Sequence, residues 1–244
     1  MFSIFQKKKY LIDSIRGITD FHNHLLPGID DGADNIADSV SMLEKFKDMG
    51  IENFIHTPHI IADYYPNTKE TIGSAFTNLY SEYKSKVPNR FSAEYMMDQH
   101  FVEILDRDEI IPLFESLVLV EMSYFQPPIN INEIIFKIQN KSLKPILAHP
   151  ERYAFYHAKD LSMYQNLKSM GCLFQMNMLS LSPHYGGMVQ KMAFKLLEEN
   201  MIDFISSDAH RIEHLDKIEK IALSLKHKDL LDTIIEKQKE KISF

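Results

Sequence analysis

The chain has 244 residues, of which 45% are hydrophobic and 25% are charged, as in ordinary globular proteins. Its formal net charge of −7 argues against non-specific nucleic-acid binding, which depends on a basic face that displaces counterions. No apolar run approaches the roughly 20 residues that a helix needs to span a bilayer, so we expect no direct membrane insertion.

Apolar runs typical of β-strands alternate with helical patterns along the chain. The runs that predict strands are residues 18–24, 51–57, 91–97, 117–122, 145–149, 172–178 and 204–207. Apolar residues three and four positions apart, from Ile36 to Phe46, predict a first helix that ends at Gly50. Further helical patterns cover residues 68–86, 132–140, 161–170, 188–200 and a tail from about 213 to 241.

This alternation predicts an α/β fold with a parallel sheet and short crossovers. About seven such units in a chain of this length favour a closed or nearly closed TIM-like barrel over an open, doubly wound sheet. No Gly-x-Gly-x-x-Gly or phosphate-loop signature follows a predicted strand, so nothing indicates a nucleotide site. We place an N-terminal extension at residues 1–17 and a single domain, including the C-terminal helical tail, at residues 18–244.

Polar residues stand at or just past the end of nearly every predicted strand. In a parallel barrel all the carboxyl ends open on one face, where the active sites of such barrels are built. Side chains that are far apart in sequence are therefore expected to converge there. The candidates are His22, His24, Asp31, His59, Glu94, Glu121, His149, Asp208 and His210.

These residue types predict a metal centre. A His-x-His pair in an extended strand points both imidazoles to the same side, as His22 and His24 would. Carboxylates inside apolar strands, such as Glu94 and Glu121, are costly to bury unless they are paired or bound to metal. Imidazole and carboxylate without thiolate suit Mn²⁺, Fe²⁺ or Zn²⁺. The candidates are too many for one ion and suit two or three.

The single cysteine, Cys172, excludes an internal disulfide and a thiolate zinc site. It lies in an apolar run, so a buried thiol is expected rather than a nucleophile. The Cys-x5-Arg loop of cysteine-based tyrosine phosphatases is absent, because position 178 is Met178. Since the start of the chain also lacks the order of a secretory signal, we expect a cytoplasmic protein.

The motifs around these residues closely resemble the polymerase and histidinol phosphatase (PHP) superfamily. More narrowly, they resemble the bacterial metal-dependent tyrosine-protein phosphatases of capsular and exopolysaccharide operons. The matching stretches are residues 20–32, 57–59, 93–95, 120–121, 148–153 and 207–210. The Leu-Pro-Gly-x-Asp-Asp-Gly loop and the His-Pro-Glu-Arg-Tyr motif are typical of the phosphatase branch. The resemblance implies a distorted (β/α)7 barrel with three divalent ions, commonly Mn²⁺, with Fe or Zn as alternatives.

The resemblance also implies a role for each residue. The first ion would be held by His22, His24, Glu94 and Asp208, the second by Glu94, Glu121 and His149, and the third by Asp31, His59 and His210. Arg152, Asp208 and His210 would serve catalysis, with Arg152 contacting the phosphate through its fork of donors. The family often has a second phosphate-binding arginine; position 215 is Leu215 here, and the nearest candidate is Arg211.

The implied activity is attack of a metal-bridging hydroxide on phosphotyrosine in a protein substrate. That substrate would be a membrane-associated bacterial tyrosine kinase that controls capsule or exopolysaccharide synthesis. Three alternatives stay open: a small-molecule phosphatase similar to histidinol phosphatase, a non-catalytic metal-binding scaffold, and a structural partner of the kinase. The sequence leaves the general acid and the oligomeric state open.

Overall fold

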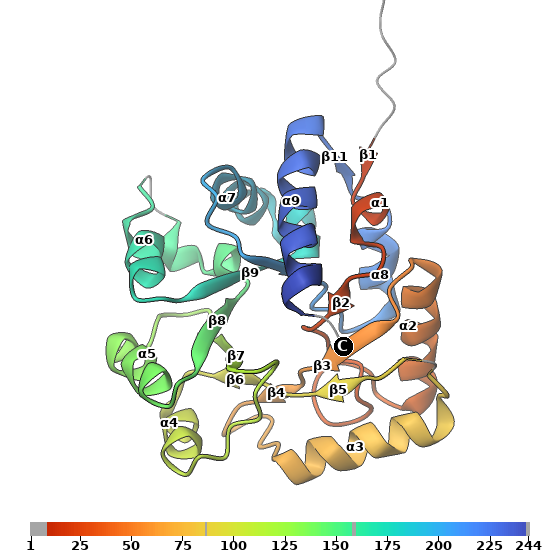
Figure 1. Cartoon of the computed structure of the whole chain (residues 1–244), viewed down its shortest axis with the longest axis horizontal. Coiled ribbons are helices and arrows are strands. Elements are labelled where there is room, and N and C mark those ends of the chain that lie inside the picture. The colour runs from red at the N-terminus through yellow and green to blue at the C-terminus, as the bar shows by residue number, and fades with distance from the viewer. Residues whose placement is uncertain (1–8, 86, 158–159, 243–244) are drawn as a thin grey trace, which may run out of the picture.

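A ring of strands surrounded by helices makes up the chain in this computed structural model, which describes residues 9–85, 87–157 and 160–242 (Figure 1). The ring strands are β2 (Thr19–Asp20), β3 (Asn53–His56), β4 (His59–Ile60), β5 (Arg90–Phe91), β6 (Glu94–Met96), β7 (Leu117–Glu121), β8 (Lys144–Ala148), β9 (Leu173–Asn177) and β10 (Phe204–Ser206). One sheet has the order β10-β9-β8-β7-β6-β4 and the other the order β2-β3-β5. The pairings in both are parallel, as predicted.

Two breaks explain why the ring strands fall into two sheets. β3 pairs with β5 in the three-stranded sheet, and β4 pairs with β6 in the six-stranded sheet. The chain therefore passes from the three-stranded to the six-stranded sheet after His56 and again after Phe91. Pro58, which has no N–H to donate to a ladder, stands at the first break. The strand predicted at residues 51–57 is therefore followed by a separate short strand at His59, and the strand predicted at residues 91–97 is divided into two.

The ring closes where the segments beyond β2 and β10 meet. Asn23 forms a parallel bridge with Ala209, and His24 N donates to Ala209 O at 3.0 Å. Asp208 N donates to His22 O at 2.8 Å. With β3 and β4 taken as one path, and β5 and β6 as another, seven strand paths surround the centre. The expected distorted (β/α)7 barrel is confirmed.

Helices lie around the outside of this ring (Figure 1). Those that follow the strands are α2 (Ile36–Asp48), α3 (Lys69–Glu82), α4 (Gln99–Asp106), α5 (Ile131–Asn140), α6 (Ser162–Ser169) and α7 (Gly187–Glu198). The sequence patterns did not predict α4, although Asp98 marks its start by accepting a hydrogen bond from Phe101 N at 2.9 Å. In the described parts of the chain, no helix is both long and apolar enough to cross a membrane.

The predicted helical tail at residues 213–241 is wrong as one continuous helix. It is divided into α8 (Ile212–Ile218), the short strand β11 (Ala222–Leu223) and α9 (Leu225–Lys241). Ser224 starts the last helix, because its hydroxyl accepts a hydrogen bond from His227 N at 3.2 Å. β11 pairs antiparallel with β1 (Lys9–Tyr10), which ties the start of the described chain to the segment just before α9.

The N-terminal extension predicted at residues 1–17 is described only from residue 9, and residues 1–8 lie outside the described parts. After β1 the chain forms α1 (Ile12–Ile15), and the side chains of Leu11 and Ile15 are fully buried. The boundary at residue 18 stays a prediction.

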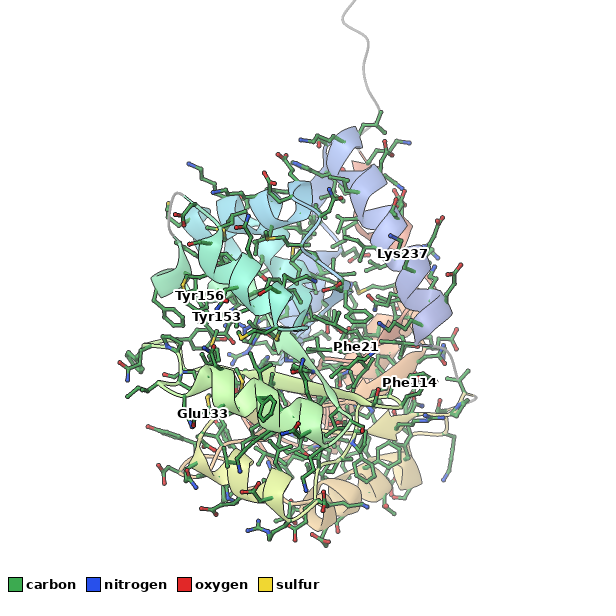
Figure 2. All side chains as sticks on the ribbon, turned by 60° about the vertical axis from the view of Figure 1, so that its left-hand side comes forward. Phe21, Phe114, Glu133, Tyr153, Tyr156 and Lys237 are labelled. Carbon is green, nitrogen blue, oxygen red and sulfur yellow. The ribbon has the colours of Figure 1, made fainter. Side chains whose placement is uncertain are left out.

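The inside of the barrel is filled by apolar side chains. The Phe21 and Phe204 rings meet edge to face with centroids 5.5 Å apart, in one cluster with Leu119 and Ile146. Figure 2 shows Phe21 in the interior of the molecule. Since side chains alternate along a strand, Glu121 at the end of β7 faces the same side as Leu119. The apolar cluster therefore forms a floor, and polar groups face inward at the carboxyl ends of the strands.

A side-chain amide completes the ring below this floor. Gln238 on α9 is buried, and its Nε2 donates to Thr19 O at 3.3 Å and to Ile205 O at 3.0 Å. Its Oε1 accepts from Ile205 N at 2.9 Å. The amide thus bridges β2 and β10, for which the described sheets record no direct ladder at this level.

Gln238→Leu is expected to lower the free energy of unfolding by about 2–3 kcal/mol, because it leaves the buried N–H and C=O of Ile205 without partners. Urea denaturation followed by circular dichroism measures this change. The matched control is Glu236→Leu at an exposed position of the same helix, which should change stability by less than about 0.5 kcal/mol. Equal effects of the two substitutions would contradict the bridging role of the amide.

Candidate metal centre

All nine predicted ligands gather at the carboxyl-terminal opening of the barrel. They come from the last residue of β7, from the first residues of β4 and β6, and from the segments that follow β2, β8 and β10. They form four overlapping groups, and within each group the potential ligand atoms lie within 4.8 Å of one another. The groups are His24 with Asp31, His59 and His210; His22 with Glu94 and His149; His22 with His24 and Asp208; and His59 with Glu94 and Glu121.

Glu94 occupies the centre of the cluster and is fully buried. Its Oε2 lies 3.2 Å from His22 Nε2, 3.6 Å from His24 Nε2 and 3.1 Å from His59 Nδ1. Its Oε1 lies 3.1 Å from His149 Nε2. One carboxylate thus touches four imidazoles from three parts of the chain, as a ligand shared between ions would.

Asp31 marks the more open side of the cluster. Its Oδ1 lies 3.5 Å from His59 Nε2 and 3.4 Å from His210 Nε2. The His24 and His210 rings stack with centroids 3.9 Å apart. The Asp31 side chain is 48% exposed, whereas Glu94 has no exposed surface. Water can therefore reach the Asp31 side of the cluster directly.

The buried atoms at the centre lack ordinary hydrogen bonds. Within the described residues, five of them have no hydrogen-bond partner: His22 Nε2, His24 Nε2, His59 Nδ1, Glu94 Oε2 and Glu121 Oε1. An unpaired buried polar atom costs about 1–3 kcal/mol, and more if it is charged. Divalent ions coordinated by imidazole nitrogen and carboxylate oxygen would satisfy all five together. The residues therefore fit metal ions of the Mn²⁺, Fe²⁺ or Zn²⁺ type.

The same groups stabilise one another's charged forms. Burial lowers the pKa of His24, but the carboxylates of Asp30 and Asp208 together outweigh burial and raise this pKa to about 10. Burial disfavours ionised Glu94, but His22 and His59 outweigh it and hold the Glu94 pKa well below its usual range. The carboxylate is therefore ready to coordinate an ion, whereas a protonated histidine must first release its proton.

Two of the candidate ligands have an unusual backbone conformation. φ is 36° at His149 and 49° at Asp208, in the left-handed region that residues other than glycine rarely adopt. Each residue follows a ring strand, at the point where the chain turns over the opening of the barrel. Strain of this kind is maintained at functional sites, where the surrounding structure fixes the conformation.

A carboxylate that the sequence analysis did not single out holds the loop after His24. Asp30 Oδ2 accepts from His24 Nδ1 at 2.7 Å and from His59 N at 3.1 Å, and its Oδ1 accepts from Gly32 N at 3.0 Å. A Cβ on Gly32 would lie 2.0 Å from His24 O, so this close return of the loop requires glycine. Of the two adjacent aspartates, Asp31 thus faces the cluster while Asp30 fixes the His24 ring with its Nε2 toward the centre.

Two amide side chains of β9 support the other side of the cluster and were also missed. Gln175 Oε1 lies 2.7 Å from His22 Nδ1, which leaves His22 Nε2 free to face the centre of the cluster. Asn177 Nδ2 donates to Asp208 Oδ2 at 2.7 Å. Their position was a signal that the sequence analysis could have used, because two amide side chains within an apolar strand need polar partners.

Arg152 lies at the rim of the cluster, in the 3-10 turn η1 (Pro150–Arg152) that follows β8. Its Nη1 donates to Asp208 Oδ2 at 2.7 Å, and its side chain is 19% exposed. The guanidinium carbon stands 4.9 Å from the centroid of the Tyr124 ring and 4.2 Å from that of the Tyr185 ring. With aromatic rings beside its faces, the guanidinium keeps its edge, with several N–H donors, for an anion.

Two other residues from the sequence analysis lie away from this rim. Arg211 is exposed at the start of α8 and lines a hollow with Asp31 and His210. Its role in substrate binding stays a prediction. Cys172 is buried, as expected, and burial raises the pKa of its thiol to about 12, which disfavours the reactive thiolate.

Comparison of the sequence with known proteins identifies its family. A family model described as capsular polysaccharide synthesis, CpsB/CapC, matches residues 18–237. CapC of Staphylococcus aureus is 29% identical over 199 residues, which cover 80% of this chain and 78% of CapC. The tyrosine-protein phosphatase YwqE of Bacillus subtilis is 28% identical over 198 residues, with the same coverage of both chains.

A solved structure supports the fold. One chain from the crystal structures of YwqE from Bacillus subtilis and CpsB from Streptococcus pneumoniae, described as unique metal-dependent tyrosine phosphatases, aligns with a TM-score of 0.74. It is 24% identical, and the alignment covers 93% of this chain and 96% of that chain. This likeness confirms the fold that the sequence resemblance implied.

Asp30→Asn is expected to weaken Mn²⁺ binding about 10- to 100-fold, the usual effect of losing a carboxylate that orients a ligand histidine. An asparagine offers one oxygen in place of two, so one of the three N–H donors around Asp30 would face an NH₂ group. Titration calorimetry measures the affinity. The matched control is Asp34→Asn, an exposed aspartate of the same loop, which should bind Mn²⁺ as the wild type does.

Proposed function

The chain belongs to the CpsB/CapC family of capsular polysaccharide synthesis, and on this premise we propose that it is a metal-dependent protein-tyrosine phosphatase. The observation that carries the proposal is the position of Arg152, whose guanidinium borders a largely buried cluster of nine residues of metal-ligand type. An arginine fork beside several divalent ions is suited to a phosphoryl group. The naming of relatives such as YwqE as tyrosine-protein phosphatases supports the same reaction.

The proposal assigns three divalent ions, with Mn²⁺ preferred and Fe²⁺ or Zn²⁺ as alternatives, to the ligand sets implied by the sequence resemblance. Glu94 would bridge the first and second ions, which agrees with its contacts to four histidines. Bound ions supply the nucleophile by lowering the pKa of coordinated water, and they offset negative charge on the phosphoryl oxygens.

The protein's own residues bind and orient the phosphoryl group in this proposal. Arg152 donates one N–H to Asp208 and keeps the others for phosphoryl oxygens, whose charge grows during the reaction. Asn177 donates to the same oxygen of Asp208, so the carboxylate that orients Arg152 is itself held in place. Tyr124 and Tyr185 exclude water from the faces of the guanidinium, which strengthens its interaction with an anion.

The surroundings of Arg152 favour an aryl phosphate over the small alkyl phosphate of the rival reaction. Aromatic rings line the phosphate side of the cluster and suit a flat phenyl group. A phenol, with a pKa near 10, also departs more readily than an alkanol, so less help from a general acid is needed. The proposal extends to a membrane-associated bacterial tyrosine kinase as the substrate and to a cytoplasmic location. The kinase as substrate depends on the family resemblance, and the location is the expectation stated from the sequence.

With Mn²⁺ present, the protein is expected to release phosphate from a tyrosine-phosphorylated peptide far faster than from histidinol phosphate. Malachite-green detection of phosphate measures both rates. A chelator should abolish activity, and added Mn²⁺ should restore it. Activity that survives the chelator would contradict the metal-dependent reaction, and the reverse ranking of the two substrates would favour the small-molecule alternative.

Arg152→Ala is expected to lower kcat/KM for the phosphopeptide about 100- to 1000-fold, in line with the loss of one donor to a developing oxyanion. Its Mn²⁺ content should equal that of the wild type, because arginine is not a ligand. Arg107→Ala, at an exposed arginine paired with Glu109, serves as the matched control with full activity. In the same assay, Arg211→Ala tests the second substrate contact: a raised KM would support it, and unchanged kinetics would remove it.

A further inference from the structure

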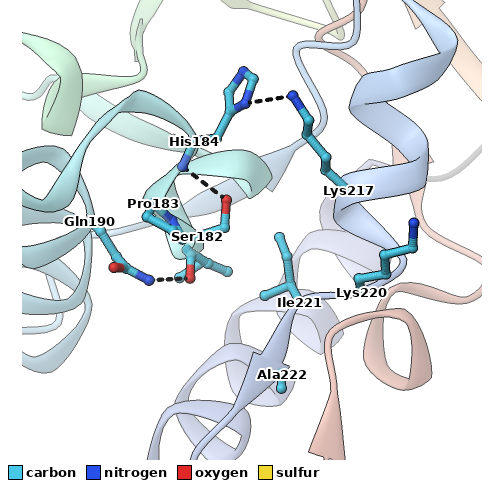
Figure 3. Close-up of a pocket in the computed structure, with 9 residues that line it drawn as sticks. Ser182, Pro183, His184, Gln190, Lys217, Lys220, Ile221 and Ala222 are labelled. Carbon is cyan, nitrogen blue, oxygen red and sulfur yellow. Dashed lines mark hydrogen bonds between the residues drawn. The ribbon is translucent and has the colours of Figure 1, made fainter.

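A second pocket lies beside the Arg152 rim, and we call it the flank pocket. It lies between the 3-10 turns η3 (Met178–Leu181) and η4 (Pro183–Tyr185) on one side and α8 and β11 on the other, and its volume is about 480 Å³ (Figure 3). Neither the family match nor the proposed reaction assigns it a role.

The flank pocket combines apolar walls with two positive charges. Leu181, Pro183 and Ile221 supply apolar surface, whereas Lys217 and Lys220 line the side formed by α8 and the residues that follow it. Figure 3 shows Lys217 reaching toward His184, and its Nζ donates to His184 Nδ1 at 3.2 Å. Burial and the nearby cations lower the pKa of His184, so this ring accepts the hydrogen bond in its neutral form.

The two lysines are not neutralised by carboxylates. The acidic residues next to them in sequence, Asp216 and Glu219, both pair with Lys45 on α2. Within the described chain, neither Lys217 nor Lys220 has a carboxylate at ion-pair distance. The protein has a net charge of −7, but these two lysines without carboxylate partners make the potential at this pocket locally positive, which attracts an anion.

The flank pocket shares a wall with the candidate active site. His184 lines the pocket, while Tyr185, the next residue in η4, stacks on Arg152. From the metal side, the His210 ring lies 5.9 Å from the His214 ring, which in turn lies 5.3 Å from the His184 ring. An extended peptide covers these two steps with about three residues, at roughly 3.3 Å each.

We propose that the flank pocket is a subsite for an anionic side chain about three residues from the phosphotyrosine of the same substrate chain. This inference rests on the proposed phosphatase function and narrows its substrate class to acidic or multiply phosphorylated segments. Lys217 and Lys220 bind the negative charge, and the apolar walls accept the stem of the side chain.

Peptides with one phosphotyrosine and a single glutamate at each position up to four residues away test the proposal, with glutamine peptides as the uncharged reference. At the favoured position, glutamate is expected to lower KM about two- to tenfold relative to glutamine with kcat unchanged, since exposed charge pairs contribute about 0.2–1 kcal/mol each. The difference should shrink at high salt. A non-hydrolysable phosphonomethyl-phenylalanine at the same position distinguishes a phosphoryl source of the charge from a carboxylate.

The double substitution Lys217→Ala with Lys220→Ala should abolish the preference for glutamate while leaving kcat and KM for p-nitrophenyl phosphate unchanged. A matched control, Lys144→Ala with Lys237→Ala, removes the same charge at exposed positions elsewhere and should keep the preference. If all phosphotyrosine peptides are hydrolysed equally well, the subsite is refuted and the phosphatase function stands. If neither peptides nor p-nitrophenyl phosphate react with Mn²⁺ present, the proposed function fails and the subsite with it.

Discussion

The structure depends on the burial of one carboxylate, that of Glu94, among imidazoles at the mouth of the barrel. A buried charge is tolerated only when it is paired and coordinated, because an isolated one costs several kcal/mol. Glu94 satisfies this condition through contacts with His22, His59 and His149, which come from three separate segments. Closure of the ring near His22 and the strand break before His59 therefore have the same effect. Each brings an imidazole to the Glu94 carboxylate, whose charge the residues of β6 itself cannot neutralise.

The sequence was sufficient for those parts of the fold that depend on periodicity. Strands such as β7 and β8 are continuous apolar runs because both faces are covered, and they were predicted to within a residue or two. The errors lie where tertiary contacts overrule local pattern. The charged tail contains a helical period throughout, but Ser224 restarts the helix and β11 pairs with β1, a partner more than 200 residues away that no local window includes.

The cluster of predicted ligands could be found from the sequence, whereas the residues that support the cluster could not. A histidine or carboxylate at the end of an apolar run is conspicuous, because apolar neighbours give it no structural reason to be there. Asp30 and Gln175 act through a second nitrogen of the ligand rings, and Tyr124 and Tyr185 act through the faces of Arg152. These roles depend on which side chains meet in space, and a single sequence does not record such meetings.

The turn after β8 carries a predicted metal ligand and the predicted phosphate-binding arginine within five consecutive residues. His149 faces the cluster with a left-handed backbone, and Arg152, one 3-10 turn later, reaches the rim. Two residues anchor this turn to the neighbouring strands. Glu151, within the turn, accepts a hydrogen bond at its Oε1 from the backbone N–H of the last residue of β9 at 2.9 Å. Tyr153, which follows the turn, accepts one at its hydroxyl from the backbone N–H just after β7 at 2.9 Å. Because both anchors hold the same short turn, displacement of either would move the ligand and the guanidinium together. The motif His-Pro-Glu-Arg-Tyr thus places His149 at the cluster and Arg152 at its rim, while Glu151 and Tyr153 fix the position of both.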